Sequence, residues 1–220
     1  MLKGKVTKMS SNYRYTRNWE NAEKEIFEGV GEFNIPVIQP ENYHSVDKWI
    51  SFNKAKTASK TEGVGIHHFI DDYQFIREWT HIDQYVNLFK KFDFVMSPDF
   101  STYADFPKAL QIYNHYRKHW IGAYLQKRGV HIIPTISWST PDSFEWCFDG
   151  EPKDSVVAVS SVGSLNVLDS FLEGYNAMLD ALHPTKIIFY GQVPEQCRGN
   201  IIKVKSFSEN LREMMVENGW

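Results

Sequence analysis

Short, almost uninterrupted apolar runs alternate along the chain with longer segments whose apolar residues recur every three or four positions. Runs of the first kind are typical of strands buried on both faces, and the second spacing indicates amphipathic helices. The pattern predicts strands over residues 33–39, 63–70, 92–96, 130–136, 156–159, 186–190 and 200–204. It predicts helices over residues 19–28, 45–55, 75–79, 82–90, 107–128, 142–148, 175–182 and 209–216.

The repeated strand–helix order predicts an α/β fold with a parallel sheet covered on both faces. We favour a parallel (β/α) barrel-like fold of six or seven units, because nearly every predicted strand ends in polar and aromatic residues that a barrel would gather on one face. An open doubly wound sheet, which would concentrate ligand groups at one switch point, is the alternative. Residues 33–220 are expected to form this single domain, and residues 1–32 an N-terminal arm with a short helix.

One stretch joins a predicted strand to a turn rich in small hydroxylated residues, K-D-S-V-V-A-V-S-S-V-G-S-L-N-V-L over residues 153–168. Amides in a turn of this kind, and at the start of the helix after it, carry partial positive charge that suits an anion. An ordinary strand-to-helix turn is the alternative. The predicted ligand-binding residues here and after neighbouring strands are Trp138, Ser160, Ser161, Gly163, Ser164, Asn166, Tyr190 and Gln192, with the Trp138 ring as a stacking platform.

Three carboxylates directly follow predicted strands, namely Asp71, Asp72 and Asp99. Carboxylates gathered at strand ends can act as general acid and base, or hold a divalent cation. Helix capping is the alternative role for each of them, but two neighbouring residues cannot both be the cap.

The histidines are weaker candidates for a functional site than the carboxylates. His67 and His68 lie in a predicted strand, so one of them faces the interior, where a satisfied core group is the commoner outcome. His115 and His119 are four residues apart on the longest helix and could share a metal ion, but no supporting carboxylate stands near them in the sequence. We therefore interpret that pair as surface or packing residues. No H-E-x-x-H spacing occurs.

Composition narrows the class of protein. The chain has 220 residues, of which 42% are hydrophobic and 15% aromatic, so a sizeable core is expected. The net charge of −3 does not suggest nucleic-acid binding through bulk charge. Two cysteines without a C-x-x-C motif indicate reduced thiols. With no long apolar run and no signal peptide, a soluble cytoplasmic protein without membrane contact is expected.

The succession F-I-D-D-Y-Q-F, S-P-D-F-S, I-P-T-I-S-W, V-S-S-V-G-S-L-N and I-I-F-Y-G-Q, between residues 69 and 192, resembles the DUF4417 family. This is a group of uncharacterised proteins from Gram-positive bacteria and their phages and mobile elements. The resemblance implies a phage or mobile-element setting. It brings no established activity, so no catalytic residue is carried over from it.

Two functions are compatible with these residues. The first is a hydrolase-like enzyme that binds a small polar or phosphorylated ligand, such as a nucleotide, at the carboxyl ends of its strands. The second is a non-catalytic binding protein that engages a host protein or nucleic acid. Its surface would comprise residues 13–19 and the basic pairs 117–118 and 127–128.

Overall fold

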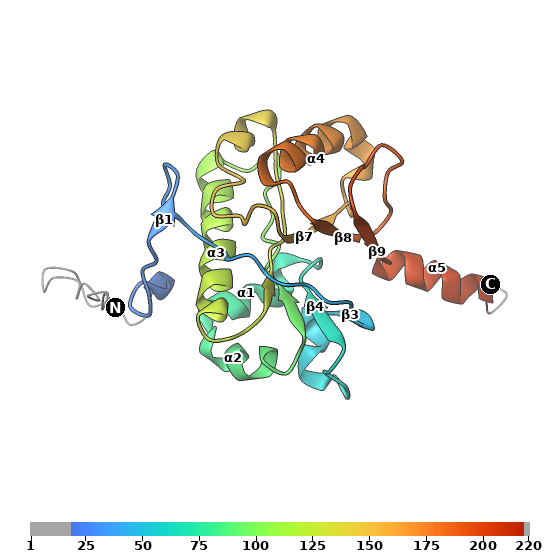
Figure 1. The fold of residues 1–220 in the computed structure, drawn as a ribbon, viewed down its shortest axis with the longest axis horizontal. Helices are drawn as coiled ribbons and strands as arrows, with labels where there is room; N and C mark the ends of the chain where they lie inside the picture. Colours follow the sequence, from blue (N-terminus) through green and yellow to red (C-terminus); the bar gives the residue numbers. More distant parts are fainter. Residues whose placement is uncertain (1–18, 218–220) are drawn as a thin grey trace, which may run out of the picture.

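The structure is a computed structural model that describes residues 19–217, and a run of seven parallel strands forms its centre (Figure 1). These strands are β3 (Lys48–Ser51), β4 (Val64–His67), β5 (Phe94–Met96), β6 (Ile132–Ile133), β7 (Val156–Ser160), β8 (Lys186–Tyr190) and β9 (Ile201–Val204). The helices are α1 (Asp72–Thr80), α2 (Asp83–Phe89), α3 (Lys108–Gln126), α4 (Leu168–Leu182) and α5 (Phe207–Glu217). Short 3₁₀ helices occupy Trp19–Asn21, Phe52–Thr57, Pro141–Glu145 and Leu165–Val167.

Within each of the two parallel sheets, every strand pairs with the next one along the chain. The first sheet has the order β3-β4-β5-β6 and the second the order β7-β8-β9, with all pairs parallel. A parallel bridge between Thr135 and Ala158 joins the two sheets. The amide of Ile136 donates to Ala158 O at 2.8 Å, and the amide of Ala158 donates to Pro134 O at 2.8 Å. The strands therefore follow one another in chain order from β3 to β9.

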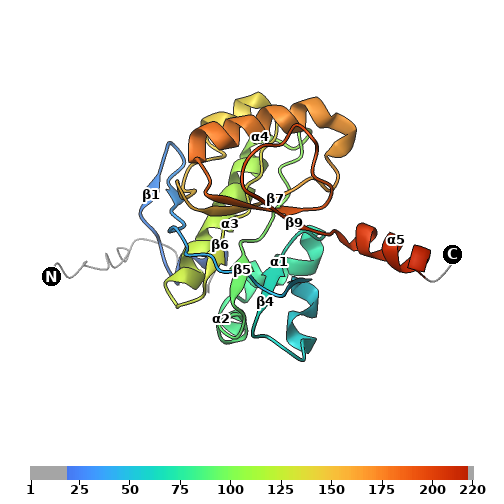
Figure 2. The same cartoon turned by 45° about the vertical axis from the view of Figure 1, so that its right-hand side comes forward.

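Helices cover one face of this run of strands, and a separate cluster of hydrophobic side chains covers the opposite face. Figure 1 and Figure 2 place α1 and α2 beside the four-stranded sheet and α4 across the three-stranded sheet. The side chains of Val64, Ile66 and Val95 pack against α1 and α2. Those of Val157 and Phe189 pack against α4. The opposite face holds a third cluster, formed by Phe94, Met96, Ile133, Val156, Ala158 and Ile188.

The predicted parallel α/β fold is confirmed. The predicted barrel is not, because within residues 19–217 no pairing between β3 and β9 closes the sheet. The predicted strands near residues 63–70, 92–96, 130–136, 156–159, 186–190 and 200–204 are all present, and the helix predicted over 175–182 begins earlier, at Leu168. In the part of the chain that the structure describes, no helix is both long and apolar enough to span a bilayer.

The helix predicted over residues 45–55 is wrong, since Lys48–Ser51 form strand β3 and a 3₁₀ helix follows. All four residues of β3 pair with β4, and neighbouring side chains go to opposite faces: Trp49 to the third cluster and Ile50 to the helix side. The ring of Trp49 lies against Gly65 so closely that a Cβ there would stand 2.4 Å from it. Tertiary pairing has overridden the helix-like spacing.

The strand predicted over residues 33–39 is also wrong as part of the main sheet. Ile35–Pro36 (β2) pair antiparallel with Gly29–Val30 (β1), away from the parallel run. Proline has no amide to donate, so Pro36 suits this short edge. The helix predicted over 19–28 is confined to Trp19–Asn21, and the remaining segment packs on α3, where Trp120 Nε1 donates to Glu25 O at 3.0 Å. The proposed domain boundary at residue 32 stays a prediction.

The contact of Trp49 with Gly65 gives a test of the β3–β4 pairing. Gly65→Ala should lower the free energy of unfolding by about 1–3 kcal/mol, because the added methyl group displaces the indole ring. Trp49→Leu should remove most of that penalty, and a double-mutant cycle from urea denaturation measures the coupling. Additive effects of the two substitutions would contradict the contact.

Candidate functional site

The carboxyl ends of the parallel strands bring the predicted site residues to one edge of the sheet. Asp71 and Asp72 follow β4, Asp99 follows β5, the turn 160–166 ends β7, and Gln192 follows β8. Across this edge the His67 ring lies 4.5 Å from the Tyr190 ring, centroid to centroid, so the ends of β4 and β8 are in contact. We call Asp71, Asp72, Asp99, the turn 160–166 and Gln192 the carboxyl-edge site.

Asp72 and Asp71 have different roles in the structure. Asp72 is the first residue of α1, and its carboxylate accepts hydrogen bonds from the Ser101 hydroxyl at 2.9 Å and the Ser101 amide at 3.1 Å. Asp72 therefore holds the loop after β5. Asp71 occupies the N-cap position without a side-chain cap hydrogen bond, is exposed, and has a contact of 3.4 Å with the Gln74 amide group. The capping role considered for Asp71 is thus not fulfilled by its side chain.

Asp99 is the carboxyl group of this edge whose acidity is most altered. Burial raises the pKa of Asp99 to about 6, and the neighbouring Asp72 charge adds to the increase, while Lys118 and His68 oppose it. A carboxylic acid with this pKa exchanges its proton near neutral pH, as a general acid or base requires. The charge of Asp72 thus contributes to the raised pKa of Asp99, and a shared catalytic role for the two carboxyl groups stays a prediction.

The serine-rich turn is built largely by its own hydrogen bonds. Ser160 Oγ accepts from the Val162 amide at 3.1 Å, and Ser161 Oγ donates to Gln192 O at 2.7 Å, which joins the turn to the segment after β8. Gly163 has φ +82° and open space around the position of a Cβ. Within residues 19–217 the Gly163 amide makes no hydrogen bond. That amide and the half-buried Ser164 are what the turn offers to a ligand, together with the exposed Asn166.

Two predicted aromatic residues pack against neighbouring elements. The Trp138 indole lies against Gly174 of α4, where a Cβ would stand 2.1 Å from Nε1, and its ring is 5.3 Å from that of Phe171. Tyr190 is buried, and its hydroxyl accepts from the Phe207 amide at 3.1 Å. Trp138 remains partly exposed, so its stacking role stays a prediction, as do the roles of Tyr190 and the exposed Gln192.

His67 is a buried group of this edge to which the sequence assigned no role. Its ring contacts those of Tyr190 and Phe69, with centroids 4.5 Å and 6.0 Å away, and its Nδ1 has no hydrogen-bond partner among residues 19–217. Burial lowers the pKa of His67 to about 3, so the ring is neutral. Its neighbour His68 faces the helices instead and pairs with the buried Glu78 at 2.8 Å.

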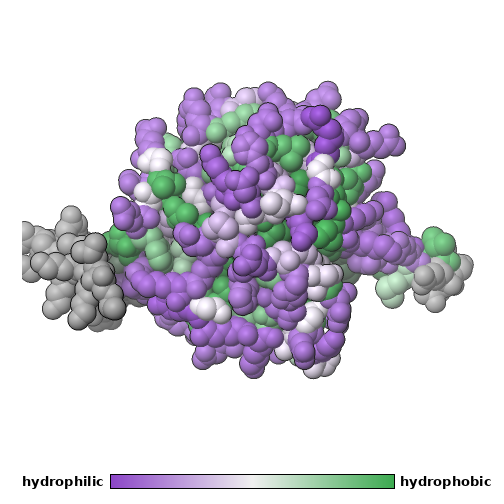
Figure 3. All heavy atoms as spheres, in the orientation of Figure 1, coloured by the Kyte–Doolittle hydropathy of each residue, from purple (hydrophilic) through white to green (hydrophobic). Residues whose placement is uncertain are grey.

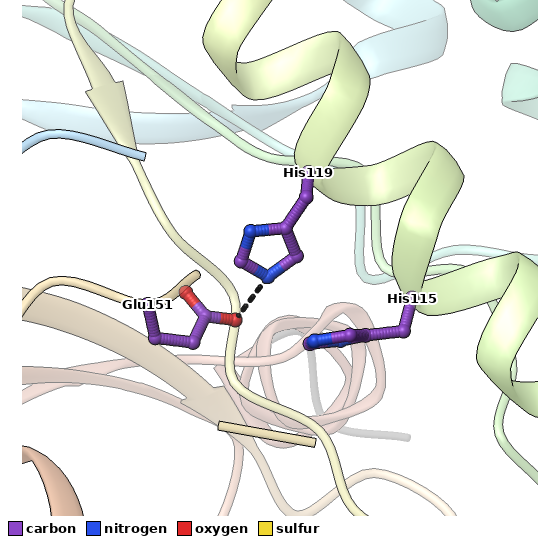
Figure 4. Close-up of side chains that lie close together, drawn as sticks. All are labelled: His115, His119 and Glu151. Atoms are coloured by element: carbon purple, nitrogen blue, oxygen red, sulfur yellow. Dashed lines mark hydrogen bonds and ion pairs between the residues drawn. The ribbon is translucent and has the colours of Figure 1, made fainter. Parts of the chain in front are cut away.

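A second group of titratable side chains lies between α3 and the segment before β7. His115, His119 and Glu151 are all buried, and each offers one ligand atom within 4.8 Å of the others (Figure 4). His119 Nε2 is 2.9 Å from Glu151 Oε1, which also accepts from the buried Lys118 ammonium at 2.7 Å. We call His115, His119 and Glu151 the His–Glu cluster.

This cluster corrects the interpretation of the two histidines. Of the two alternatives considered, surface or packing residues, both histidines are buried packing residues, and a carboxylate does lie near them: Glu151, 32 residues beyond His119 along the chain. The helical i, i+4 spacing identified the pair in the sequence, but no local spacing indicates that Glu151 joins it. Burial lowers the pKa of His115 well below its usual range, and the Lys118 and His119 charges lower the pKa of Glu151.

The comparisons with known proteins show the family to which the chain belongs and two relatives from phages. The chain belongs to the family described as "Domain of unknown function (DUF4417)", which matches residues 27–208. It is similar to the Gene 1 protein of Mycobacterium phage L5, at 36% identity over 172 residues, 76% of this chain and 75% of the relative. It is also similar to the Gene 1 protein of Mycobacterium phage D29, at 31% identity over 201 residues, 88% of this chain and 74% of the relative. No solved structure matches the chain.

Asp99 gives a pH-dependent prediction. The folded state keeps the Asp99 proton up to a pH of about 6, whereas the unfolded chain releases it near its ordinary pKa of 3.8. Ionised Asp99 therefore destabilises the fold increasingly as the pH rises from about 4 to about 6. Asp99→Asn should raise the free energy of unfolding by about 3 kcal/mol at pH 8 and leave it nearly unchanged below pH 4.

Urea denaturation at several pH values measures this difference. Asp105→Asn, at an exposed aspartate of the loop after β5, is the matched control and should show no such pH dependence. A constant difference between Asp99→Asn and the wild type at every pH would exclude the titration of Asp99 as its cause.

Proposed function

We propose that this protein is a hydrolase-like enzyme that binds a small polar or phosphorylated ligand, such as a nucleotide, at the carboxyl-edge site. The observation that carries the proposal is Asp99, a half-buried carboxyl group with a pKa of about 6 beside Asp72. Asp99 would be the general acid or base of the reaction, and Asp72 would set its charge environment. A catalytic role for Asp71 and the binding of a divalent cation at these carboxylates stay predictions.

The geometry of the turn supports an anionic group on the ligand. Among the described residues the Gly163 amide has no hydrogen-bond partner and the space around its Cβ position is open, and Ser164 lies beside it in the turn. Small residues allow a ligand to approach the backbone closely. Ser160, Ser161 and Gln192 would act mainly by holding the turn in shape, since the Ser161–Gln192 hydrogen bond fixes it against the end of β8.

The consecutive strand order supports the barrel-like arrangement that we propose for this fold. Trp49 of β3 and Val204 of β9 both pack on the third cluster, although the two strands stand at opposite ends of the strand order. In such an arrangement the strand ends surround one site, and the distance between the Asp99 region and the serine-rich turn is short.

A thermal-shift screen of nucleotides, sugar phosphates and divalent cations tests ligand binding. A ligand present at a hundredfold excess over its Kd adds about 2.7 kcal/mol to the stability of the folded state. The shift should disappear in Ser164→Trp and persist in Ser45→Trp, an exposed serine before β3 at the opposite edge. No shift across the panel would contradict the proposed ligand class.

Turnover of the ligand so identified tests the role of Asp99. Asp99→Asn should reduce kcat by at least about 100-fold, the usual contribution of general acid–base catalysis, while the variant still binds the ligand. Asp105→Asn serves again as the control. Full activity of Asp99→Asn would exclude Asp99 as the acid or base.

A partner-binding role is the second candidate, and α5 favours it. This helix projects from the body of the fold and exposes apolar side chains (Figure 1, Figure 3), including Phe207 at 68%, Leu211 at 42% and Val216 at 76%. The basic surface considered from the sequence is less suited, because Lys118 is buried and Arg117 and Arg128 lie over aromatic rings. Residues 13–18 of the proposed contact arm lie outside the described residues.

Two variants separate these functions. In a partner-binding protein, Leu211→Lys should abolish co-purification with the partner from host cells, while Asp99→Asn leaves it unchanged. Leu211 is exposed, so its replacement should alter the free energy of unfolding by no more than about 0.5 kcal/mol. Loss of co-purification in both variants would point instead to a partner bound at the carboxyl-edge site.

A further inference from the structure

We infer that the His–Glu cluster binds one divalent transition-metal ion of the zinc type. Imidazole nitrogens and a carboxylate oxygen are the ligands that zinc takes from proteins, and here two imidazoles and one carboxylate offer atoms within 4.8 Å of one another. The inference goes beyond the proposed hydrolase function and does not depend on it, because neither Asp72 nor Asp99 belongs to this cluster.

The fold brings the three side chains to one place. His115 and His119 are one helical turn apart on α3, and therefore lie on the same face of that helix. Their ring centroids are 4.3 Å apart. Glu151 approaches from the segment that leads into β7, and Figure 4 shows both rings and the carboxylate directed toward one another.

Backbone carbonyls hold both rings from behind. His119 Nδ1 donates to Pro36 O at 2.9 Å, and His115 Nε2 donates to Asp149 O at 3.0 Å. A carbonyl oxygen only accepts, so each of these nitrogens carries a hydrogen. The other nitrogen of His119, Nε2, donates to Glu151 Oε1 at 2.9 Å, and a bound metal ion would displace that hydrogen. A histidine ring with one hydrogen keeps a lone pair on its other nitrogen, which is the form that ligates a metal ion. Histidines that ligate metals are commonly oriented by such an outer hydrogen bond.

The Glu151 carboxylate supplies a second, independent observation. The Glu151 side chain is fully buried, and within residues 19–217 its Oε2 atom has no hydrogen-bond partner. A buried oxygen without a partner costs the free energy of its lost hydration, and this cost is larger for a charged group than for a neutral one. Oε1 is the carboxylate oxygen that faces the histidine rings, and a metal ion bound by both oxygens would also give Oε2 the partner that residues 19–217 do not provide.

A metal ion in the cluster would lie near a second positive charge, the ammonium group of Lys118. The Lys118 ammonium donates to Glu151 Oε1 and to Thr135 O, both at 2.7 Å. It therefore contacts only one of the two carboxylate oxygens of Glu151. Carboxylates that ligate metals are in turn hydrogen-bonded by outer groups, and Lys118 has that place here. A cluster that served as an ion pair alone would leave Oε2 unsatisfied.

The ion would connect parts of the chain that are distant in sequence. It would join α3 to the segment before β7, while the Pro36 carbonyl ties the same point to β2. Three protein ligands leave one position of a tetrahedral ion, which a water molecule can take. The burial of all three residues indicates a site that holds its ion firmly rather than one open to a large substrate.

The test is titration of the full-length, chelator-stripped protein with Zn²⁺ by calorimetry, and with Co²⁺ by visible absorption. The wild type should bind one equivalent of each ion. His115→Gln should weaken Zn²⁺ binding at least 100-fold, more than the loss of an outer hydrogen bond usually does. It should keep the fold, because the glutamine amide can still donate toward Asp149 O. Glu151→Gln should also abolish binding.

A matched control and a charge variant complete the experiment. His131→Gln changes an exposed histidine that is paired with Glu41 on the surface, and should bind Zn²⁺ like the wild type. In Lys118→Met the ion would supply the missing positive charge, so Zn²⁺ should raise Tm more than it does in the wild type. If the wild type shows no saturable binding, or if His115→Gln and Glu151→Gln bind as tightly as His131→Gln, the cluster is an ion pair and the inference is wrong.

Discussion

Lys118 carries a full positive charge into the interior of the fold, and the arrangement around it depends on neutralising that charge. Removing one partner of a buried ion pair typically costs 3–5 kcal/mol, because the other charge is left uncompensated. Lys118 therefore requires Glu151 beside it, and its second hydrogen bond goes to Thr135 O. Thr135 is also the residue through which the two sheets meet. One ammonium group thus fixes α3, the segment before β7 and the junction between the sheets together.

The strands were predictable because they are buried on both faces, which leaves a short apolar run in the sequence. This holds for Phe94–Met96 and Val156–Ser160, whose side chains pack alternately on the helix side and on the third cluster. It fails for β3, an edge strand whose Trp49 and Ile50 are only partly buried and whose flanks mimic a helical spacing. Which segment pairs with an edge is decided by tertiary contacts, such as Trp49 against Gly65, that local spacing does not contain.

The chemistry of the site was less predictable than its position. Parallel strands place their carboxyl ends on one edge, so the order of elements predicts that Asp72, Asp99 and the serine-rich turn all follow strands at that edge. The altered acidity of Asp99 depends on burial and on charges from other segments, and no spacing encodes it. In the same way, His115 and His119 were visible as a pair, but Glu151 joins them only through the path of the chain.

The chain-order pairing of the strands also bears on how the protein is made. Each strand from β4 to β9 pairs with the strand, or for β7 with the bridge residue Thr135, that precedes it in the sequence. Every new strand therefore finds its partner already synthesised, and no pairing within the parallel run waits for a distant part of the chain. Because pairings of short sequence separation favour rapid folding, such a topology can assemble progressively from its N-terminal end during translation.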